Sequence, residues 1–180
     1  QWSSSAASDV YKRQVLGLDP GSLRTGWGIV DFAGSRMMHV GSGIIDLRAF
    51  KEPSKKLAAL VDELDAVVTL HAPTSAGIEK VFHGKNAKSA LTLGQARGAA
   101  LSVIGRHDLT CLELAPSQVK VNVTGHGSAD KNQVMAMVQR LLNMTITTTH
   151  DESDALAIAI AAGAGLRTAT QDWMAQHGVR

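Results

Sequence analysis

The chain has 180 residues, of which 44% are hydrophobic and 19% charged, a balance that suits one globular domain with a sizeable core. Its single cysteine, Cys111, excludes an intrachain disulfide and any multi-cysteine zinc site. The formal net charge is only +2, but residues 80–140 hold eight Lys and Arg against three Asp and Glu, whereas the remainder holds ten against thirteen. This uneven distribution predicts either a polyanionic partner on one face or the ordinary solvated surface of helices.

The sequence contains no apolar run near the roughly 20 residues that a membrane span requires. No basic segment followed by an apolar one marks a secretory signal, so we expect a cytoplasmic protein with no membrane partner. The first residues, QWSSSAASDVYKRQ, lack an initiator Met and a clear period. We therefore expect residues 1–14 to be a non-native-looking leader, from a truncated or misjoined start, before a domain at 15–166 and a C-terminal tail at 167–180.

Three extended segments open the domain. They cover Val15–Leu18, Thr25–Ala33 and Met37–Asp46, and the turn residues between them predict an antiparallel meander. Leucines and valines at a spacing of three to four residues then predict a helix over Pro53–His71, with Ser54 as its N-cap.

Helices and short strands alternate in the second half. We expect strands at Ala76–Phe82 and Leu109–Leu114, joined by a long helix at Asn86–Arg106. Further helices are expected at Ser117–Val123, from an N-cap at Ser128 to Leu142, and at Asp151–Gly163. Because helical crossovers favour parallel pairing, the prediction is an α/β fold with a mixed five-stranded sheet, three antiparallel strands then two parallel, flanked by helices.

Four carboxylates interrupt segments that are otherwise apolar. Asp19 closes the first strand in LGLDPGSLRTGWGIV, and Glu79 lies within the strand GIEKVF. Asp151 and Asp154 open an apolar helix three residues apart, and so share one helix face. Each has an ordinary alternative: an Asx turn for Asp19, the solvent face of an edge strand for Glu79, and favourable interaction with the helix dipole for the pair.

Gathered at one sheet edge, the four acids would repel one another and raise one another's pKa. A divalent cation would remove this repulsion, and carboxylates with water suit magnesium. The four acids therefore predict a magnesium site that supports phosphoryl transfer. A competing interpretation takes DPGSLRTGWG as an ATP-cradling loop of the sugar-kinase and actin type. It requires two lobes, and the sequence shows no second glycine-rich hairpin.

The chain resembles the RuvC family of Holliday junction resolvases, in the RNase H-like superfamily. The resemblance spans about residues 15–162 in the family's order, through the stretches LGLDPGSLRTGWGIV, VGSGII, IEKVFHGKNAKSALTLGQARG, LAPSQVKVNVTGHGSADKNQV and DESDALAIAI. It implies a metal-dependent endonuclease that resolves four-way junctions by paired symmetric nicks in opposing strands during recombination and repair. It also implies a homodimer, one or two Mg²⁺ per subunit with Mn²⁺ as a substitute, and the branch-migration proteins RuvA and RuvB as partners.

By position, the resemblance makes the four acids both the catalytic residues and the metal ligands: Asp19, Glu79, Asp151 and Asp154. It implies DNA-binding roles for Phe82, Lys85, Asn86, Lys88, Lys120 and Lys131. Phe82 would stack on bases at the junction point, with a place in the core as its alternative. The lysines would bind phosphate, with surface solubility as theirs. The long helix, with its Gly94 and Gly98, would lie near the dimer interface or pack on the sheet of its own subunit.

Two histidines and the tail depart from the pattern. His150 precedes Asp151, in a turn where some relatives use a histidine, and is either a metal ligand or a helix-cap neighbour. His126 is expected to be structural or to face phosphate, and Trp173 to be a packing anchor or without a role. Two other functions stay open: a catalytically impaired junction-binding protein, and a nuclease for RNA–DNA hybrids, against which the IEKVF…GQARG block argues.

Overall fold

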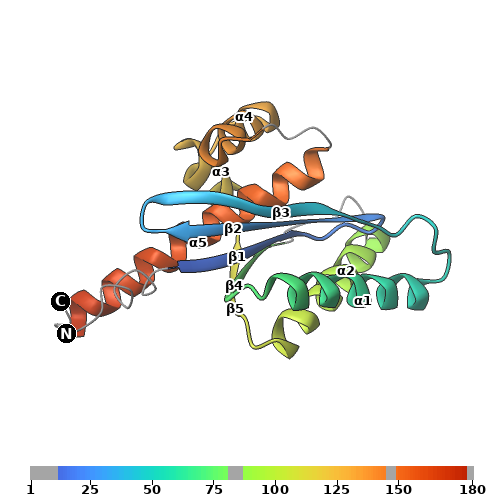
Figure 1. Ribbon diagram of the computed structural model, residues 1–180. Coiled ribbons are helices and arrows are strands. Elements are labelled where there is room, and N and C mark those ends of the chain that lie inside the picture. Colours follow the sequence, from blue (N-terminus) through green and yellow to red (C-terminus); the bar gives the residue numbers. More distant parts are fainter. Residues whose placement is uncertain (1–11, 81–86, 145–148, 178–180) are drawn as a thin grey trace.

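The computed structural model describes residues 12–80, 87–144 and 149–177, and a five-stranded sheet forms its centre (Figure 1). The strands are β1 Lys12–Asp19, β2 Arg24–Ala33, β3 Arg36–Asp46, β4 Ser75–Glu79 and β5 Thr110–Leu114. Their order in the sheet is β3-β2-β1-β4-β5. The first three pair antiparallel, and β4 runs parallel to both β1 and β5, so the predicted mixed sheet is confirmed.

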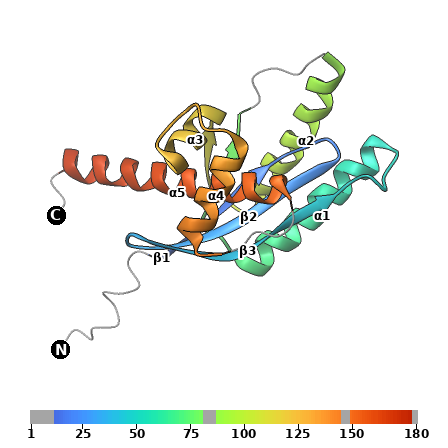
Figure 2. The same cartoon turned by 90° about the horizontal axis from the view of Figure 1, so that it is seen from above.

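Helices cover both faces of the sheet (Figures 1 and 2). They are α1 Pro53–His71, α2 Ala87–Arg106, α3 Pro116–Thr124, α4 Lys131–Leu142 and α5 His150–His177. One core cluster joins α1 and α2 to one face of the sheet, and a second joins α3, α4 and α5 to the other. Within the described residues, no helix is both long and apolar enough to cross a membrane.

The alternation of side chains along β1 and β4 directs two of the acids to the α5 face. Leu16 and Leu18 of β1 belong to the core cluster of α1 and α2. Because successive side chains of a strand point to opposite faces, Asp19 points to the side of α5. In β4, Ala76 and Ile78 likewise face α1 and α2, so Glu79 also points to the side of α5.

A row of glycines allows α5 to lie directly on the sheet. Gly28, Gly17 and Gly77 are register partners across β2, β1 and β4. A Cβ atom added at Gly17 would lie 2.0 Å from the carbonyl oxygen of Ala155, and one at Gly77 would lie 2.5 Å from the Cβ of Ala162. Alanines of α5 meet Gly17 and Gly77, and Leu156 meets Gly28, so helix and sheet approach more closely than side chains on these strand residues would permit.

Both ends of the chain differ from the expected boundaries. Strand β1 begins at Lys12, because residues 12–14 continue the antiparallel ladder opposite Asp31–Ala33 of β2. The Arg13 side chain also donates a hydrogen bond to the carbonyl of Gly163 in α5, at 3.1 Å. At the other end α5 continues to His177 and includes Trp173, where a patternless tail was expected from residue 167. Backbone pairing and helix propagation require no apolar pattern, which explains both differences.

Two predicted N-caps are wrong. Helix α4 is capped by Asp130, not Ser128: the Asp130 carboxylate accepts a hydrogen bond from the Gln133 backbone N–H at 2.9 Å, and the Gln133 side chain accepts one from the Asp130 N–H. Helix α1 has Glu52 at its N-cap and Pro53 at its first position, so Ser54 lies inside the helix. Strand β4 ends at Glu79, where the prediction extended to Phe82, and residues 81–86 lie outside the described residues.

The glycine row gives a matched pair of substitutions. Gly17→Ala should lower the free energy of unfolding by about 3 kcal/mol or more, or prevent folding, because its methyl group overlaps the backbone of α5. Gly105→Ala in α2 meets no atom within 4 Å and should leave stability unchanged or raise it by about 0.5 kcal/mol. Urea denaturation of both variants measures the difference, and equal effects would contradict the close approach of α5.

Candidate active site

Asp19 and Glu79 lie side by side at the ends of neighbouring parallel strands. Leu18 and Ile78 are register partners in β1 and β4, so the residue that follows each of them, Asp19 and Glu79, reaches the same sheet edge. Strand β4 is an interior strand between β1 and β5, which rules out the edge-strand alternative for Glu79. The two carboxylates therefore face the same side of the sheet next to each other.

The first turn of α5 brings Asp151 and Asp154 to this edge. Gly26 of β2 is the register partner of Asp19, and a Cβ atom added there would lie 2.2 Å from the carbonyl oxygen of Asp151. The backbone of the turn thus rests on the strand residue next to Asp19. The spacing of Asp151 and Asp154 then places both carboxylates on one helix face.

Three of the four acids line one cavity of about 370 Å³ between the sheet, α3, α4 and α5. Its lining consists of Asp19, Glu79, Pro116, Val119, Lys120, Lys131, Val134, Asp154, Ala157 and Ile158. Asp151 is not part of this lining, but its charge reaches Asp19. The cavity therefore combines carboxylates, two lysines and an apolar wall.

The carboxylates make one another hard to ionise. Burial raises the pKa of Asp19 to about 7, with further contributions from the negative charges of Glu79, Asp154 and Asp151. Burial and the charge of Asp154 also raise the pKa of Glu79. Within the described residues, neither the Asp19 nor the Glu79 carboxylate has a hydrogen-bond or ion-pair partner. The site therefore holds more negative charge than its neighbours balance.

Two basic side chains partly offset this charge. The Lys131 ammonium group lies 3.1 Å from a carboxylate oxygen of Asp154, and this hydrogen bond raises the pKa of Lys131. The Arg24 guanidinium lies 4.0 Å from the carboxylate of Asp151. Lys131 was expected to contact DNA, and the structure places it inside the acidic cluster.

The donor set fits a hard divalent cation in chemistry and charge. Carboxylate oxygens are the ligands that Mg²⁺ prefers, and a cation would lower the raised pKa values of Asp19 and Glu79. In the described part of the chain, no three acidic, histidine or cysteine side chains converge into a ready ligand set. Metal binding at these residues therefore requires adjustment of side chains.

The structure separates the remaining candidate residues. Lys120 lines the cavity, whereas Lys88 is exposed on the second residue of α2 and is not part of the lining. Phe82, Lys85 and Asn86 lie outside the described residues. His150 is the exposed first residue of α5 and also is not part of the lining.

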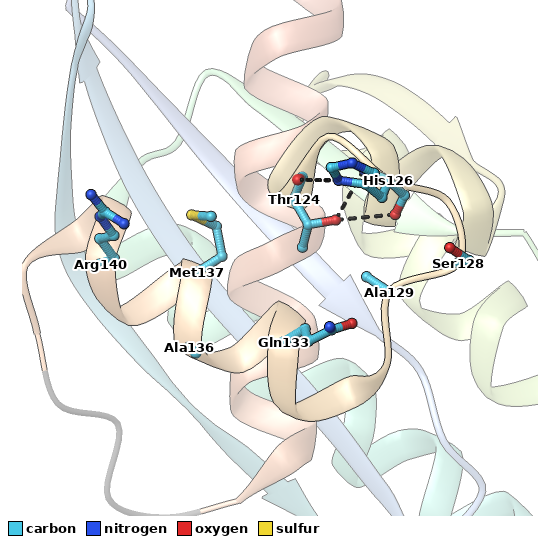
Figure 3. A pocket seen from close by; sticks show the side chains of 8 residues that line it. All are labelled: Thr124, His126, Ser128, Ala129, Gln133, Ala136, Met137 and Arg140. Carbon is cyan, nitrogen blue, oxygen red and sulfur yellow. Dashed lines mark hydrogen bonds between the residues drawn. The ribbon is translucent and has the colours of Figure 1, made fainter.

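His126 borders a different hollow, of about 570 Å³ (Figure 3). Its Nδ1 donates a hydrogen bond to the Thr124 carbonyl at 3.1 Å, and the Thr124 hydroxyl donates one to the His126 carbonyl at 3.0 Å. These bonds tie His126 to the end of α3. None of the four acids lines this hollow, so His126 lies apart from the acid-lined cavity, and its expected structural or phosphate-facing role stays a prediction.

Sequence reasoning missed a residue that supports Glu79. Arg97 of α2 donates a hydrogen bond from Nε to the Glu79 backbone carbonyl at 3.1 Å, and it also pairs with the carboxylate of Glu113 in β5. Its guanidinium group thus links the ends of β4 and β5. Arg97 lies in the GQARG stretch of the sequence, but only the fold shows which backbone group it binds.

Known proteins share this sequence and fold. A family model described as "Crossover junction endodeoxyribonuclease RuvC" matches residues 15–162. The protein of that name from Hyphomonas neptunium is 41% identical over 129 residues, which cover 72% of this chain and 77% of the relative. The one from Acinetobacter baumannii is 44% identical over 137 residues, which cover 76% of this chain and 75% of the relative.

Among solved structures, Thermus thermophilus RuvC superposes with a TM-score of 0.80 at 25% identity, covering 87% of this chain and 97% of that one. The same protein in complex with a Holliday junction substrate gives 0.82 at 24% identity, covering 88% and 97%. The yeast mitochondrial Holliday junction resolvase Ydc2 gives 0.64 at 13% identity, covering 91% and 85%. The fold is thus the RNase H-like fold of hydrolytic nucleases. Within that class, the chain belongs to the RuvC family.

The raised pKa of Asp19 predicts how stability depends on pH without metal. Because its pKa is about 7 in the folded chain and 3.8 ordinarily, the folded state binds more protons between these values. Stability should therefore fall as pH rises from about 4 to 7, by on the order of 1 kcal/mol per pH unit. Denaturation in chelator should show a smaller decline for Asp19→Asn, which should be the more stable protein at pH 7. Parallel curves would contradict the prediction.

Proposed function

We propose that this chain is a metal-dependent endonuclease that resolves four-way DNA junctions by paired symmetric nicks in opposing strands, in recombination and repair. The observation that carries the proposal is the meeting of four acids from β1, β4 and α5 at one sheet edge, beside a cavity that two lysines also line. The names of its relatives, crossover junction endodeoxyribonuclease, support the same reaction and substrate.

The four acids would hold the metal in this proposal: Asp19, Glu79, Asp151 and Asp154. The family is one of metal-dependent nucleases, and we propose Mg²⁺, one or two ions per subunit, with Mn²⁺ as a substitute. When bound, the metal supplies an activated water and stabilises the leaving oxygen of the phosphodiester. The apolar wall of Val119, Val134 and Ala157 limits bulk water beside the acids.

Basic side chains would bring the DNA backbone to this acidic edge. Lys120 and Lys131 face the same cavity as the acids, so a phosphate between them would meet positive charge there. Lys85, Asn86 and Lys88 would extend the contact along the strand, and Phe82 would stack on an unpaired base. The Holliday junction bound by the Thermus relative is the model for this substrate.

Two nicks on opposing strands require two active sites, so we propose a two-fold homodimer. Part of α2 supports this assembly: a Cβ atom at Gly94 or Gly98 would meet no atom within 4 Å, and Leu91 is 66% exposed. One face of α2 is buried in the core of its own subunit, through Ala96, Ala100 and Val103. The opposite face is therefore available for contact with a second subunit. A cytoplasmic location and partnership with RuvA and RuvB complete the proposal.

A catalytically impaired junction-binding protein is the second candidate. It is favoured by one observation, the ion pair of Lys131 with Asp154, which places an ammonium group among the proposed ligands. Both candidates bind a junction, and only the first cuts it.

Cleavage of a labelled four-way junction separates the two. We expect magnesium-dependent paired nicks on the junction, and none on a linear duplex of the same sequence or in chelator. Asp19→Asn should bind the junction as the parent does and lose at least about 100-fold in nicking rate, because it removes an anionic ligand without changing the basic surface. Binding without nicks by the parent chain would favour the second candidate. Loss of binding together with cleavage would instead give Asp19 a folding role.

The cavity position of Lys120 can be tested by salt dependence. Lys120→Ala should weaken junction binding and reduce the slope of log K against log salt by about 1, since one phosphate contact is lost. Arg36→Ala is the matched control: it removes one exposed positive charge at the β2–β3 turn, roughly 23 Å along the strands from the Asp19–Gly26 pair. Equal slopes for the two variants would place Lys120 outside the DNA contact.

A further inference from the structure

Three side chains link β3 to the first turn of α5. The Ser42 hydroxyl donates a hydrogen bond to a carboxylate oxygen of Glu152, and the Ser42 oxygen lies 2.8 Å from Nε2 of His39. A serine hydroxyl has one proton, and Ser42 donates it to Glu152, so in the bond between His39 and Ser42 the donor is Nε2–H of His39. The chain therefore runs in one direction, from His39 through Ser42 to the carboxylate.

Glu152 is not a fifth member of the acid cluster. It follows Asp151 by one residue, which turns its side chain by about 100° around the helix. It does not line the cavity, and it is absent from the charges that raise the pKa of Asp19, which are Glu79, Asp154 and Asp151. Its carboxylate accepts the hydrogen bond of Ser42 in β3.

Ser42 occupies a place where a short side chain can reach α5. It is the register partner of Gly28, and so extends the row of small residues on which α5 lies. The first turn of α5 is then held by strand residues at two further points, the contact of the Asp151 carbonyl with Gly26 and the approach of Arg24 to the Asp151 carboxylate. The Ser42–Glu152 bond reaches this turn from β3, on the other side of β2.

We propose that Ser42, backed by His39, is a positioning residue that fixes the first turn of α5 through Glu152, and thereby sets where Asp151 and Asp154 stand relative to Asp19. This role rests on the proposed nuclease function. Helix α5 is a stiff element, so a tilt of its first turn moves both aspartates together. Displacements near 1 Å at a reacting centre cost on the order of 100-fold in rate, which makes a small tilt measurable.

The kinetic test compares Ser42→Ala, Glu152→Ala and the double variant. Each single variant should lower the nicking rate roughly tenfold at limiting Mg²⁺ and raise the Mg²⁺ concentration for half-maximal rate, with junction binding in chelator unchanged. The double variant should be no worse than either single one, because both remove the same link. Ser42→Thr, which keeps the hydroxyl, should restore the parent Mg²⁺ dependence.

Thr168→Val is the matched control, since it also removes a hydroxyl, one that bonds to the Ala164 carbonyl further along α5 and away from its first turn. It should behave as the parent. Unchanged Mg²⁺ dependence in Ser42→Ala and Glu152→Ala, or additive losses in the double variant, would overturn the proposal while leaving the nuclease function intact.

A second measurement does not depend on activity. Amide hydrogen exchange should be faster in Ser42→Ala and Glu152→Ala than in the parent at residues 153–155, where the Ser153 N–H bonds to the Thr149 carbonyl at 3.4 Å, and unchanged in β1 and β4. If the parent chain does not nick junctions, this result still decides the positioning role. Equal exchange in the first turn of α5 in all three proteins would overturn it.

Discussion

The close contact between α5 and the sheet determines where the chemistry can occur. Gly28, Gly17 and Gly77 place no side chain between the helix and three adjacent strands, and the helix meets Gly17 and Gly77 with alanines and Gly28 with Leu156. This contact fixes the distance between the helix and the sheet along the glycine row. The acids of its first turn are therefore placed by the packing of the core, in the same frame that holds Asp19 and Glu79 at the strand ends.

This placement has an electrostatic cost that local packing does not remove. The same approach that positions the acids also buries Asp19 next to other negative charges, which is why its pKa rises to about 7. A sequence selected only for stability would place neutral side chains at these strand ends. The retained carboxylates are a local violation of folding preferences, and such violations gather at functional sites.

Local sequence patterns predicted the strands, the helices and their pairing in the sheet well. The mixed pairing of the sheet was predicted from a meander and two helical crossovers, although the order of its strands was not. Helix α1 was predicted with its observed ends, because its apolar spacing is regular and Pro53 and His71 border it. The ends of the chain were predicted poorly, since residues 12–14 join β1 through backbone pairing, which no side-chain pattern reveals.

The candidate site was predictable only in part, for the same reason. The convergence of Asp19 and Glu79 follows from strand alternation and parallel pairing, both of which can be inferred from sequence. The support given by Arg97 to the Glu79 carbonyl, and by Ser42 to Glu152, depends on the tertiary approach of distant segments. Similarly, Lys131 was identified as basic and near DNA, but its bond to Asp154 depends on how α4 packs beside α5.

That bond bears on whether the acid cluster can accept a metal. The Lys131 side chain is 69% exposed, and ion pairs at such exposure contribute only about 0–1 kcal/mol. A divalent cation carries twice the charge of an ammonium group and interacts with several carboxylates at once, so it competes with Lys131 for Asp154 on favourable terms. Once released, the lysine remains at the cavity wall beside Lys120, where a DNA phosphate would need positive charge. The ion pair is therefore compatible with an active nuclease, since the cation and the phosphate together offer each partner of the pair a stronger interaction than the one they replace.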